Sequence, residues 1–346
     1  MPYIFVQFFK KEDMNRFIEA HNRDFSTALA EVKKGHKSTH WIWYIFPQVN
    51  GLGSSWHSHS YAINTLDEAK AFLADNTLGT NLKEICKALL SLNGVSAYDV
   101  FGDDDKKVRS SMTLFDAIAP GEVFGEVLDK FFKGERDELT LCRLSLYKNV
   151  TDALEFIGAD AGDFSITPHM YTKRSDNPMH LFSHMYRVMI GCALIAQKID
   201  KPRLGLLAFI GAFIHDLART NDGSDYAHGR NAAEQKLPRL THILAKYNIT
   251  DEEYDIIAKA TTYHSESIRT RLSNNCYIAS KILKDADALD RCRFNRRDAR
   301  LNINALHFYE SRDCIAQIDF ICKESRRKNC IHREIPFKEF IEVARF

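Results

Sequence analysis

The sequence LGLLAFIGAFIHDL, residues 204–217, decides the fold class of the C-terminal half of this chain. It is apolar nearly all round until its last turn, where it reaches the pair His215-Asp216. A helix that is apolar on every face is buried, so this stretch predicts a buried helix with two polar side chains at its C-terminal end. Burying such a pair costs free energy unless other groups bind it. The pair therefore requires partners from elsewhere in the chain.

Three further segments predict helices, each with a histidine or an aspartate beside its apolar stripe. Apolar residues recur at three- and four-residue spacing in these segments. One of them begins with three acids, which suit a helix N-terminus. We expect an all-α fold in which these helices pack together and direct polar side chains inward. The segments are 181–195 with His184 and Arg187, 251–264 with His264, and 277–289 with Asp287.

Histidine and aspartate side chains together are typical of divalent-metal sites. Imidazole nitrogens and carboxylate oxygens bind borderline and hard ions, so the expected metals are Mn, Fe, Co, Ni, Mg or Zn. A bound ion lowers the pKa of a coordinated water toward ~7 and polarises a phosphoryl oxygen, which favours a hydrolase. The sequence contains no Ser-His-Asp or Cys-His arrangement with a recognisable local signature that would favour another nucleophile.

Four short motifs follow one another in residues 177–310. They are His184-x-x-Arg187-Val188, Ile214-His215-Asp216-Leu217, Tyr263-His264-Ser265 and the run from Lys284 to Asp290. Together they resemble the HD-domain superfamily of metal-dependent phosphohydrolases. The resemblance implies an HD-type helical bundle that hydrolyses a phosphoester or phosphoanhydride. It also implies that one divalent ion is held by His184, His215, Asp216 and Asp287, with Asp216 as a catalytic residue.

Two of these positions have competitors nearby. The run Lys284-Asp285-Ala286-Asp287 holds two aspartates two residues apart, and only one of them can face a given way on a helix. Asp287 fits the superfamily pattern better than Asp285. His180, four residues before His184, lies on the same face of its helix and competes with it.

The resemblance also suggests residues around the first ion. His228 and His264 match positions that supply further ligands or phosphate contacts, and they would complete a second ion site bridged by Asp216. Arg187 and Lys284 are candidate catalytic residues, since a cation beside the metal can neutralise a phosphate. The alternative is that both are simply solvated charges on a helix. The loop after the His-Asp pair offers candidate substrate contacts at Arg219, Asp222 and Asp225.

The N-terminal half predicts a second small helical domain, because helical spacing recurs between breaks at glycine, asparagine and proline. Its densest feature is HWIWYIFPQ, residues 40–48, whose aromatic side chains alternate as in a strand. With Tyr61 and the run RSSMTLF, residues 109–115, this motif closely resembles an uncharacterised bacterial domain family of unknown function, sometimes labelled calpastatin-like. That family brings no established activity. The predicted helices are 25–32, 66–73, 82–92 and 123–132.

Two interpretations of these N-terminal motifs remain open. The aromatic side chains either fill the core of a small domain or form a pocket. In the second case aromatic faces would stack a flat ring while polar side chains bind phosphate groups, which suits a nucleotide-like ligand. The candidate substrate-binding residues are His40, Trp41, Trp43, Tyr61, Arg109, Ser110, Ser111 and Thr113.

The composition bounds the class of protein. The 346 residues are 45% hydrophobic and 27% charged, as in a globular protein of two domains. Lys and Arg number 47 against 46 acids, which disfavours a nuclease on long polymers. No apolar run approaches the roughly 20 residues of a membrane span, and the start lacks a secretory leader. Eight cysteines without C-x-x-C spacing indicate free thiols, so we expect a soluble, cytoplasmic protein.

The expected organisation is a helical domain at 1–144, a junction at 145–176, an HD-type domain at 177–310 and a C-terminal extension at 311–346. The expected function is metal-dependent hydrolysis of a small phosphorylated substrate, nucleotide-like, with one or two ions per chain. The N-terminal domain would bind a ligand or carry a second activity. The alternative is a nucleotide-sensing protein with a regulatory or vestigial metal site. The sequence does not define an oligomeric state.

Overall fold

The chain is helical. The computed structural model describes residues 12–53, 55–172, 182–221, 225–268, 271–294, 301–330 and 334–345. Within these residues there is no β-strand, and the extended pairing is an isolated bridge between Val49 and Ile63. The all-α prediction is confirmed. None of the helices in this described part combines the length and apolar character that crossing a membrane requires.

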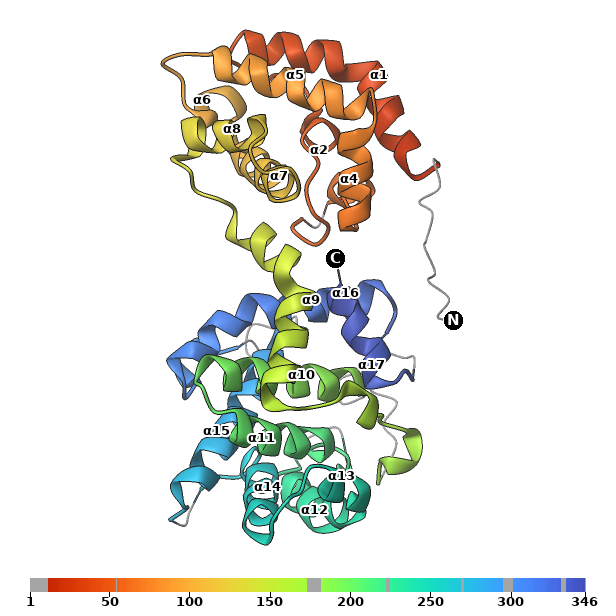
Figure 1. The fold of residues 1–346 in the computed structure, drawn as a ribbon, viewed down its shortest axis with the longest axis vertical. Helices are drawn as coiled ribbons and strands as arrows, with labels where there is room; N and C mark the ends of the chain where they lie inside the picture. Colours follow the sequence, from red (N-terminus) through yellow and green to blue (C-terminus); the bar gives the residue numbers. More distant parts are fainter. Residues whose placement is uncertain are drawn as a thin grey trace. The chain divides into compact units, whose positions relative to one another are not determined.

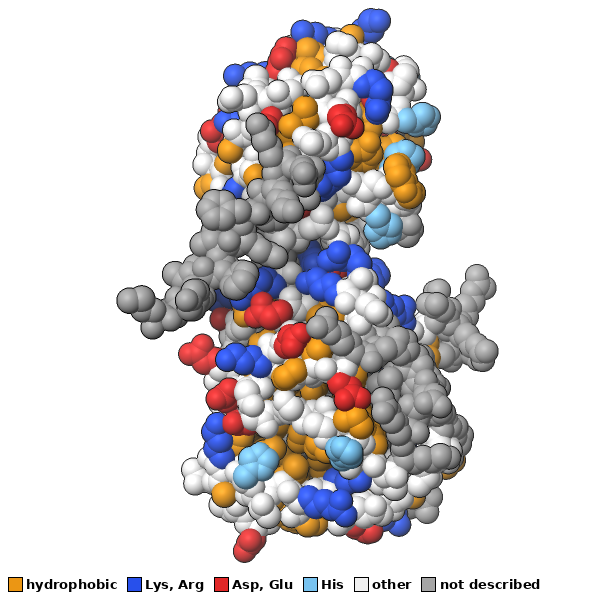
Figure 2. Space-filling view, turned by 90° about the vertical axis from the view of Figure 1, so that its right-hand side faces the viewer, with side chains coloured by type: hydrophobic (Ala, Val, Ile, Leu, Met, Phe, Trp, Pro, Cys, Tyr) orange, Lys and Arg blue, Asp and Glu red, His pale blue; other side chains and the backbone are white. Residues whose placement is uncertain are grey.

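Two compact units make up the chain, Met1–Ser145 and Leu146–Arg345. The face drawn in Figure 2 carries basic and acidic side chains on each unit, as the near-equal numbers of the two charges predict. The first unit contains α1 (Glu12–Lys33), α2 (Ile42–Ile45), α3 (Trp56–Ser60), α4 (Leu66–Ala74), α5 (Leu78–Ser91), α6 (Ala97–Phe101), α7 (Asp105–Ile118), α8 (Val123–Phe132) and the start of α9 (Glu138–Ile157), as Figure 1 shows.

A line of buried phenylalanines joins four helices of the first unit. Phe17 of α1 meets Phe72 of α4 edge to face at 5.1 Å, and Phe72 lies 5.6 Å from Phe115 of α7. Phe115 in turn lies 5.5 Å from Phe124 of α8. Offset and edge-to-face rings add to the stability gained by burying them. This line of rings joins α1, α4 and α8, which overlap the predicted helices 25–32, 66–73 and 123–132, to α7, which was not among the predicted helices.

The aromatic motif at residues 40–48 is not extended. Residues Ile42–Ile45 form the short helix α2, in which Ile42, Tyr44 and Ile45 are buried. The alternation of large aromatic residues suggested a strand, but it arises here because one turn of helix and its flanks are packed on the inside. Trp41 and Phe46, on either side of α2, are both buried.

The second unit contains α10 (Phe182–Lys198), α11 (Pro202–Ile214), α12 (His228–Gln235), α13 (Thr241–Lys246), α14 (Asp251–Tyr263), α15 (Asn274–Leu289), α16 (Ile315–Arg327) and α17 (Phe337–Phe340). Helices α10, α11, α14 and α15 pack on one another. Two glycines allow the close approach. A Cβ atom at Gly191 of α10 would lie 3.1 Å from the Cβ of Ala286, and one at Gly211 of α11 would lie 3.0 Å from the Thr261 hydroxyl. These contacts bring the polar ends of the four helices together.

The expected junction and C-terminal extension both pack on this bundle. Phe164, from the junction, meets Phe209 and Phe213 of α11 edge to face at 4.9 and 5.2 Å. From the extension, Phe337 and Phe340 lie 5.1 and 5.3 Å from Tyr186 of α10. These segments therefore belong to the second unit, which begins within α9 at Leu146.

The buried His21 makes the first unit sensitive to acid. Its Nε2 bonds the Tyr44 carbonyl at 2.9 Å, its Nδ1 bonds the Asn81 amide at 3.2 Å, and burial lowers its pKa from 6.5 to about 4. As the pH falls, His21 therefore binds a proton in the unfolded chain before it does so in the folded chain. Stability is full above about pH 6.5 and falls by roughly 3 kcal/mol as the pH drops to about 4.

Tryptophan fluorescence measures this effect, because the three tryptophans, Trp41, Trp43 and Trp56, all lie in the first unit. We expect the urea midpoint of the wild-type fluorescence transition to fall between pH 7 and pH 4.5. In His21→Gln, which keeps an amide donor, the fall should be much smaller. An equal fall in both proteins would contradict the assignment to His21.

Candidate metal centre

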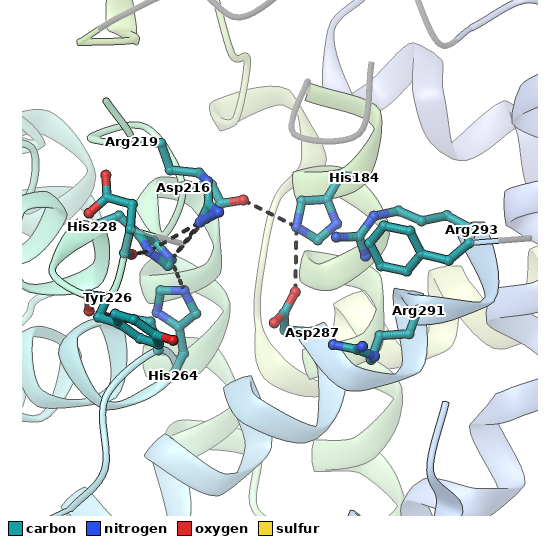
Figure 3. Close-up of a pocket in the computed structure, with 12 residues that line it drawn as sticks. His184, Asp216, Arg219, Tyr226, His228, His264, Asp287, Arg291 and Arg293 are labelled. Carbon is teal, nitrogen blue, oxygen red and sulfur yellow. Dashed lines mark hydrogen bonds and ion pairs between the residues drawn. The ribbon is translucent and has the colours of Figure 1, made fainter. Parts of the chain in front are cut away.

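Helix ends bring the predicted metal-ligating side chains together, and five of them line one cavity: His184, Asp216, His228, His264 and Asp287. His184 lies in α10, His215 and Asp216 follow α11, Asp287 lies in the last turn of α15, and His264 follows α14. The His184 Nε2 atom lies 3.4 Å from an oxygen of Asp216 and 3.4 Å from an oxygen of Asp287 (Figure 3). All five residues except Asp287 are buried, and Asp287 is partly exposed toward the cavity.

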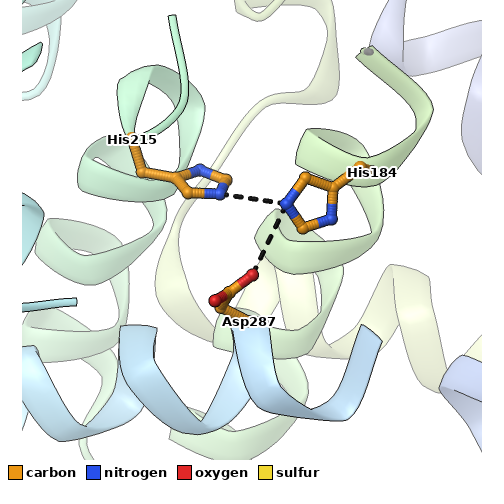
Figure 4. Close-up of side chains that lie close together, drawn as sticks. All are labelled: His184, His215 and Asp287. Carbon is orange, nitrogen blue, oxygen red and sulfur yellow. Dashed lines mark hydrogen bonds and ion pairs between the residues drawn. The ribbon is translucent and has the colours of Figure 1, made fainter. Parts of the chain in front are cut away.

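The histidines are oriented through their far nitrogens. The Nδ1 atom of His184 lies 2.7 Å from Asp290 Oδ2, and the Nδ1 atom of His215 lies 2.7 Å from the Ala212 carbonyl. Each Nδ1 must donate to its oxygen acceptor, so each neutral ring has a bare Nε2. These two bare nitrogens face each other at 3.3 Å beside Asp287 (Figure 4). Two lone pairs at that distance repel each other, and a divalent metal ion bound by both would remove the repulsion.

A second pair of histidines repeats this arrangement. His264 Nδ1 donates to the Thr261 carbonyl, and His228 Nδ1 donates to the Asp225 carbonyl. Their Nε2 atoms lie 2.8 Å apart, and His228 Nε2 lies 3.1 Å from Asp216 Oδ1. The other oxygen of Asp216, Oδ2, is the one nearest His184. The two carboxylate oxygens of Asp216 therefore face different histidine sets.

The local charges match this donor set. Burial lowers the pKa of His215, and burial together with the nearby imidazoles of His215 and His228 lowers the pKa of His264 to about 3. Burial alone would raise the pKa of Asp287, but His184 and the other nearby basic groups reverse this and hold it below its usual value. Neutral imidazoles and ionised carboxylates are the forms that bind metal. The set His184, His215 and Asp287, and the set His215, Asp216 and His264, each bring ligand atoms close enough to hold an ion.

Asp290 is a site residue that the sequence motifs did not single out. Besides His184, its carboxylate accepts hydrogen bonds from the guanidinium groups of Arg187 and Arg293 at 2.5 to 3.2 Å. These cations, Arg187 foremost, overcome the effect of burial and hold the pKa of Asp290 far below its usual value. A buried anion of this kind fixes the tautomer of a ligating histidine. Its place three residues after Asp287, about one helical turn, was the available signal.

Arg187 has a different place from the one predicted. Its guanidinium is buried. The Nε and Nη2 atoms donate to the two carboxylate oxygens of Asp290, and Nη1 donates to the Ser325 hydroxyl at 3.2 Å. A phosphate that drew Arg187 away would take from the buried Asp290 the guanidinium that contacts both of its oxygens. The predicted phosphate contact is therefore corrected: Arg187 holds Asp290, which in turn orients His184.

The family described as "Protein of unknown function (DUF1810)" matches residues 11–144, and the family described as "HD domain" matches residues 181–292. The chain joins a DUF1810 domain to an HD domain. Both resemblances noted in the sequence are thereby confirmed. HD domains in general are metal-dependent hydrolases that bind divalent ions.

One solved structure is also similar. The conserved hypothetical protein Rv1873 from Mycobacterium tuberculosis is 36% identical over an alignment that covers 38% of this chain and 94% of that protein, with a TM-score of 0.37. Among curated proteins, none matches.

The two competing aspartates of α15 have different partners. Asp285 is buried and accepts hydrogen bonds from the backbone of His307 and Phe308 and from the Ser311 hydroxyl. Its oxygens are thus used in packing the segment after α15, while Asp287 faces the histidines. His180, the competitor of His184, lies outside the described residues, as does Asp222.

The cavity at the HD centre measures about 290 Å³. Of the weaker predictions, Arg219 and Asp225 line it, whereas Lys284 is half-buried on α15 and is not among the lining residues. Lining residues that the sequence motifs did not indicate are Tyr226, Ser265, Arg291, Arg293 and Phe294. A cavity with metal-binding donors on its floor and cations and aromatic rings at its sides can hold and orient a phosphorylated small molecule.

The predicted N-terminal pocket is largely packed into the DUF1810 core. Trp41 is 1% exposed and donates to Glu31 at 2.8 Å, and Ser110 bonds Thr140 at 2.8 Å. Ser111 and Thr113 are also buried on α7, so these four residues are corrected to core residues. The aromatic motif fills the core because α2 turns its large side chains inward.

The other predicted residues of this domain are at least partly accessible. Trp43 is half-buried and stacks on His57 at 4.8 Å, with the Lys107 ammonium 5.3 Å from its ring. His40 is exposed, Tyr61 is half-buried on Tyr44, and Arg109 is half-buried with Glu135 3.7 Å away.

Proposed function

We propose that the HD domain hydrolyses a phosphoester or phosphoanhydride bond in a nucleotide or nucleotide-derived small molecule, with one or two divalent ions. The observation that carries the proposal is the cluster of four histidines and two carboxylates, five of which line one cavity, with each histidine Nδ1 bonded to an oxygen acceptor. Nitrogen and oxygen donors of this kind suit Mn, Fe, Co, Ni, Mg or Zn.

The proposed ligand sets follow the geometry of Asp216. His184, His215, Asp216 and Asp287 would hold one ion, and His228 and His264 would hold a second that shares Asp216. When bound, the ions supply an activated water and stabilise the charge that develops on the phosphoryl group. Burial lowers the pKa of His215 and His264, which favours their neutral forms, and carbonyl and carboxylate acceptors fix the histidine rings.

Substrate recognition would come from the sides of the cavity. Arg219 lies 3.6 Å from Asp216, and Arg291 and Arg293 also line the cavity, which provides positive charge for phosphate oxygens. Tyr226, 75% exposed, and Phe294 offer aromatic faces at the same cavity. An aromatic face beside guanidinium groups suits a ring-bearing phosphate such as a nucleotide.

For the DUF1810 domain we propose a ligand-binding role on its accessible aromatic side rather than in its core. Trp43 and His57 present a stacked pair, Lys107 adds a cation, and the neighbouring Trp56 is 71% exposed. These groups support binding of a flat, anionic ligand.

The test of the HD proposal is phosphate release by the full chain. Protein freed of metal with EDTA would be reloaded with Mn, Fe, Co, Ni, Mg or Zn and assayed against nucleotides, cyclic nucleotides and sugar phosphates. We expect turnover after reloading with at least one ion and a preference for substrates that carry a base. Turnover by the metal-free protein, or none with any ion, would contradict the proposal, and the second result would favour a sensing role.

A further inference from the structure

A second cavity lies in the second unit, beside the end of α11. It measures about 450 Å³ and falls in the size range of small-molecule sites. Its apolar wall consists of Phe213, Ile214 and Leu217 from the end of α11, with Leu240 and Ile243 from the start of α13. Helix α13 lies on the right of Figure 1, and Figure 2 shows that side of the molecule. There, hydrophobic side chains lie between histidines, with basic side chains close by.

The polar part of this cavity is cationic. Lys236, only 7% exposed, lines it, together with Arg239 at its margin and the exposed imidazoles of His169 and His242. The acid that also lines it, Asp163, is already neutralised by Lys246 at 2.6 Å and accepts a hydrogen bond from the Tyr247 hydroxyl at 2.7 Å.

Lys236 is a buried cation without a counter-ion. Its ammonium donates to the Met170 carbonyl at 2.7 Å, and among the described residues no carboxylate forms an ion pair with it. Burial and the nearby Arg239 lower its pKa. Most buried charges in proteins are paired, because an unpaired charge loses its hydration without compensation. An anion in the cavity would supply the missing partner.

We propose that this cavity binds a small organic anion, with a carboxylate or phosphate head on Lys236 and an apolar body against Phe213, Ile214 and Ile243. The head would replace lost hydration around the ammonium, and charge-assisted hydrogen bonds are the stronger kind. The apolar wall favours an organic anion over inorganic phosphate, because burying the apolar body of the ligand contributes binding free energy that inorganic phosphate cannot gain.

The cavity shares structure with the metal centre. Ile214 and Leu217 stand on either side of His215-Asp216 in the chain, and the Leu217 carbonyl accepts a hydrogen bond from Thr172 at 2.8 Å. An occupant would therefore contact the segment that presents two proposed metal ligands. This second site does not depend on what the HD centre hydrolyses, since binding is measured without turnover.

The test is calorimetric titration of the full chain, freed of metal with EDTA so that the metal centre cannot capture the probe. The probes are 2-naphthoate, 2-naphthylmethylphosphonate, the neutral 2-naphthamide and inorganic phosphate. We expect at least one naphthyl anion to bind about tenfold or more tightly than 2-naphthamide or inorganic phosphate. The preferred anion then identifies the head group as carboxylate or phosphate.

Matched variants locate the binding. Lys236→Met keeps the volume and should lose about tenfold in affinity for the anion, while Lys236→Arg should retain most of it. Lys198→Met removes an exposed lysine at the end of α10 and should change nothing. Arg239→Gln removes the other cation of the cavity at an exposed position, so it serves as the test if Lys236→Met does not fold. It should lower the affinity for the anion about threefold. Equal affinity for anion and amide, unchanged binding in the folded Lys236 or Arg239 variants, or no binding of any naphthyl probe would overturn the proposal.

Discussion

Replacing Asp216 with asparagine is expected to abolish turnover by the HD domain and to reduce its metal content. The substitution keeps the shape of the side chain but removes the negative charge whose two oxygens face His184 and His228. Metal ions contribute several kcal/mol of transition-state stabilisation, so kcat should fall by about a thousandfold or more. Phosphate release and metal analysis of the purified protein measure the two effects.

A matched control lies in the same cavity. Asp225 also lines it, but its carboxylate accepts hydrogen bonds from the backbone and hydroxyl of Thr220, at 3.0 Å each. Asp225→Asn should therefore keep its full metal content. If Asp216→Asn turned over substrate as fast as the wild type, the chemistry would have to lie elsewhere in the chain.

Replacing Asp290 with asparagine should weaken metal binding, although Asp290 is not itself a proposed ligand. The neutral amide still fits, but it cannot serve as the charged acceptor for His184, Arg187 and Arg293 at once. Loss of such a supporting group typically costs about 10- to 100-fold in metal affinity. Leaving two guanidinium groups buried without their carboxylate should also cost about 3 kcal/mol of folding stability. Metal titration at a pH near 7 and thermal unfolding measure the two losses.

Asp285→Asn separates the two effects. Asp285 is equally buried on α15, but its partners are His307, Phe308 and Ser311, away from the histidines. We expect this variant to lose stability and to bind metal as the wild type does while folded. An equal loss of metal affinity in both variants would show that general loosening of α15, not the orientation of His184, is responsible.

Much of the fold follows from local pattern. The apolar run at residues 204–217 is a buried helix because no face of it can be exposed without cost, and the acids at 251–253 begin α14 because they satisfy its N-terminus. The order of the histidine and aspartate motifs likewise predicts an HD domain, and a family comparison confirms it. These features depend on residues close together in the chain.

Other features depend on contacts between distant residues. Asp285 and Asp287 lie two positions apart on one helix, so their side chains differ in direction by about 200°, which sends one carboxylate to Ser311 and the other to His184. The role of Asp290 depends on α10, which brings Arg187 to its carboxylate. The aromatic motif at residues 40–48 was compatible with a core or with a pocket, and packing on α1 and α7 makes most of it core.

The sequence by itself therefore determined the helical class, the two families and the residue types of the metal centre, because periodicity and short motifs are local properties. Only the tertiary structure decided which carboxylate faces the histidines, which charge orients them and which buried lysine forms no ion pair with the described residues. Those outcomes depend on how helices from distant parts of the chain pack, since burial and pairing are properties of the assembled bundle.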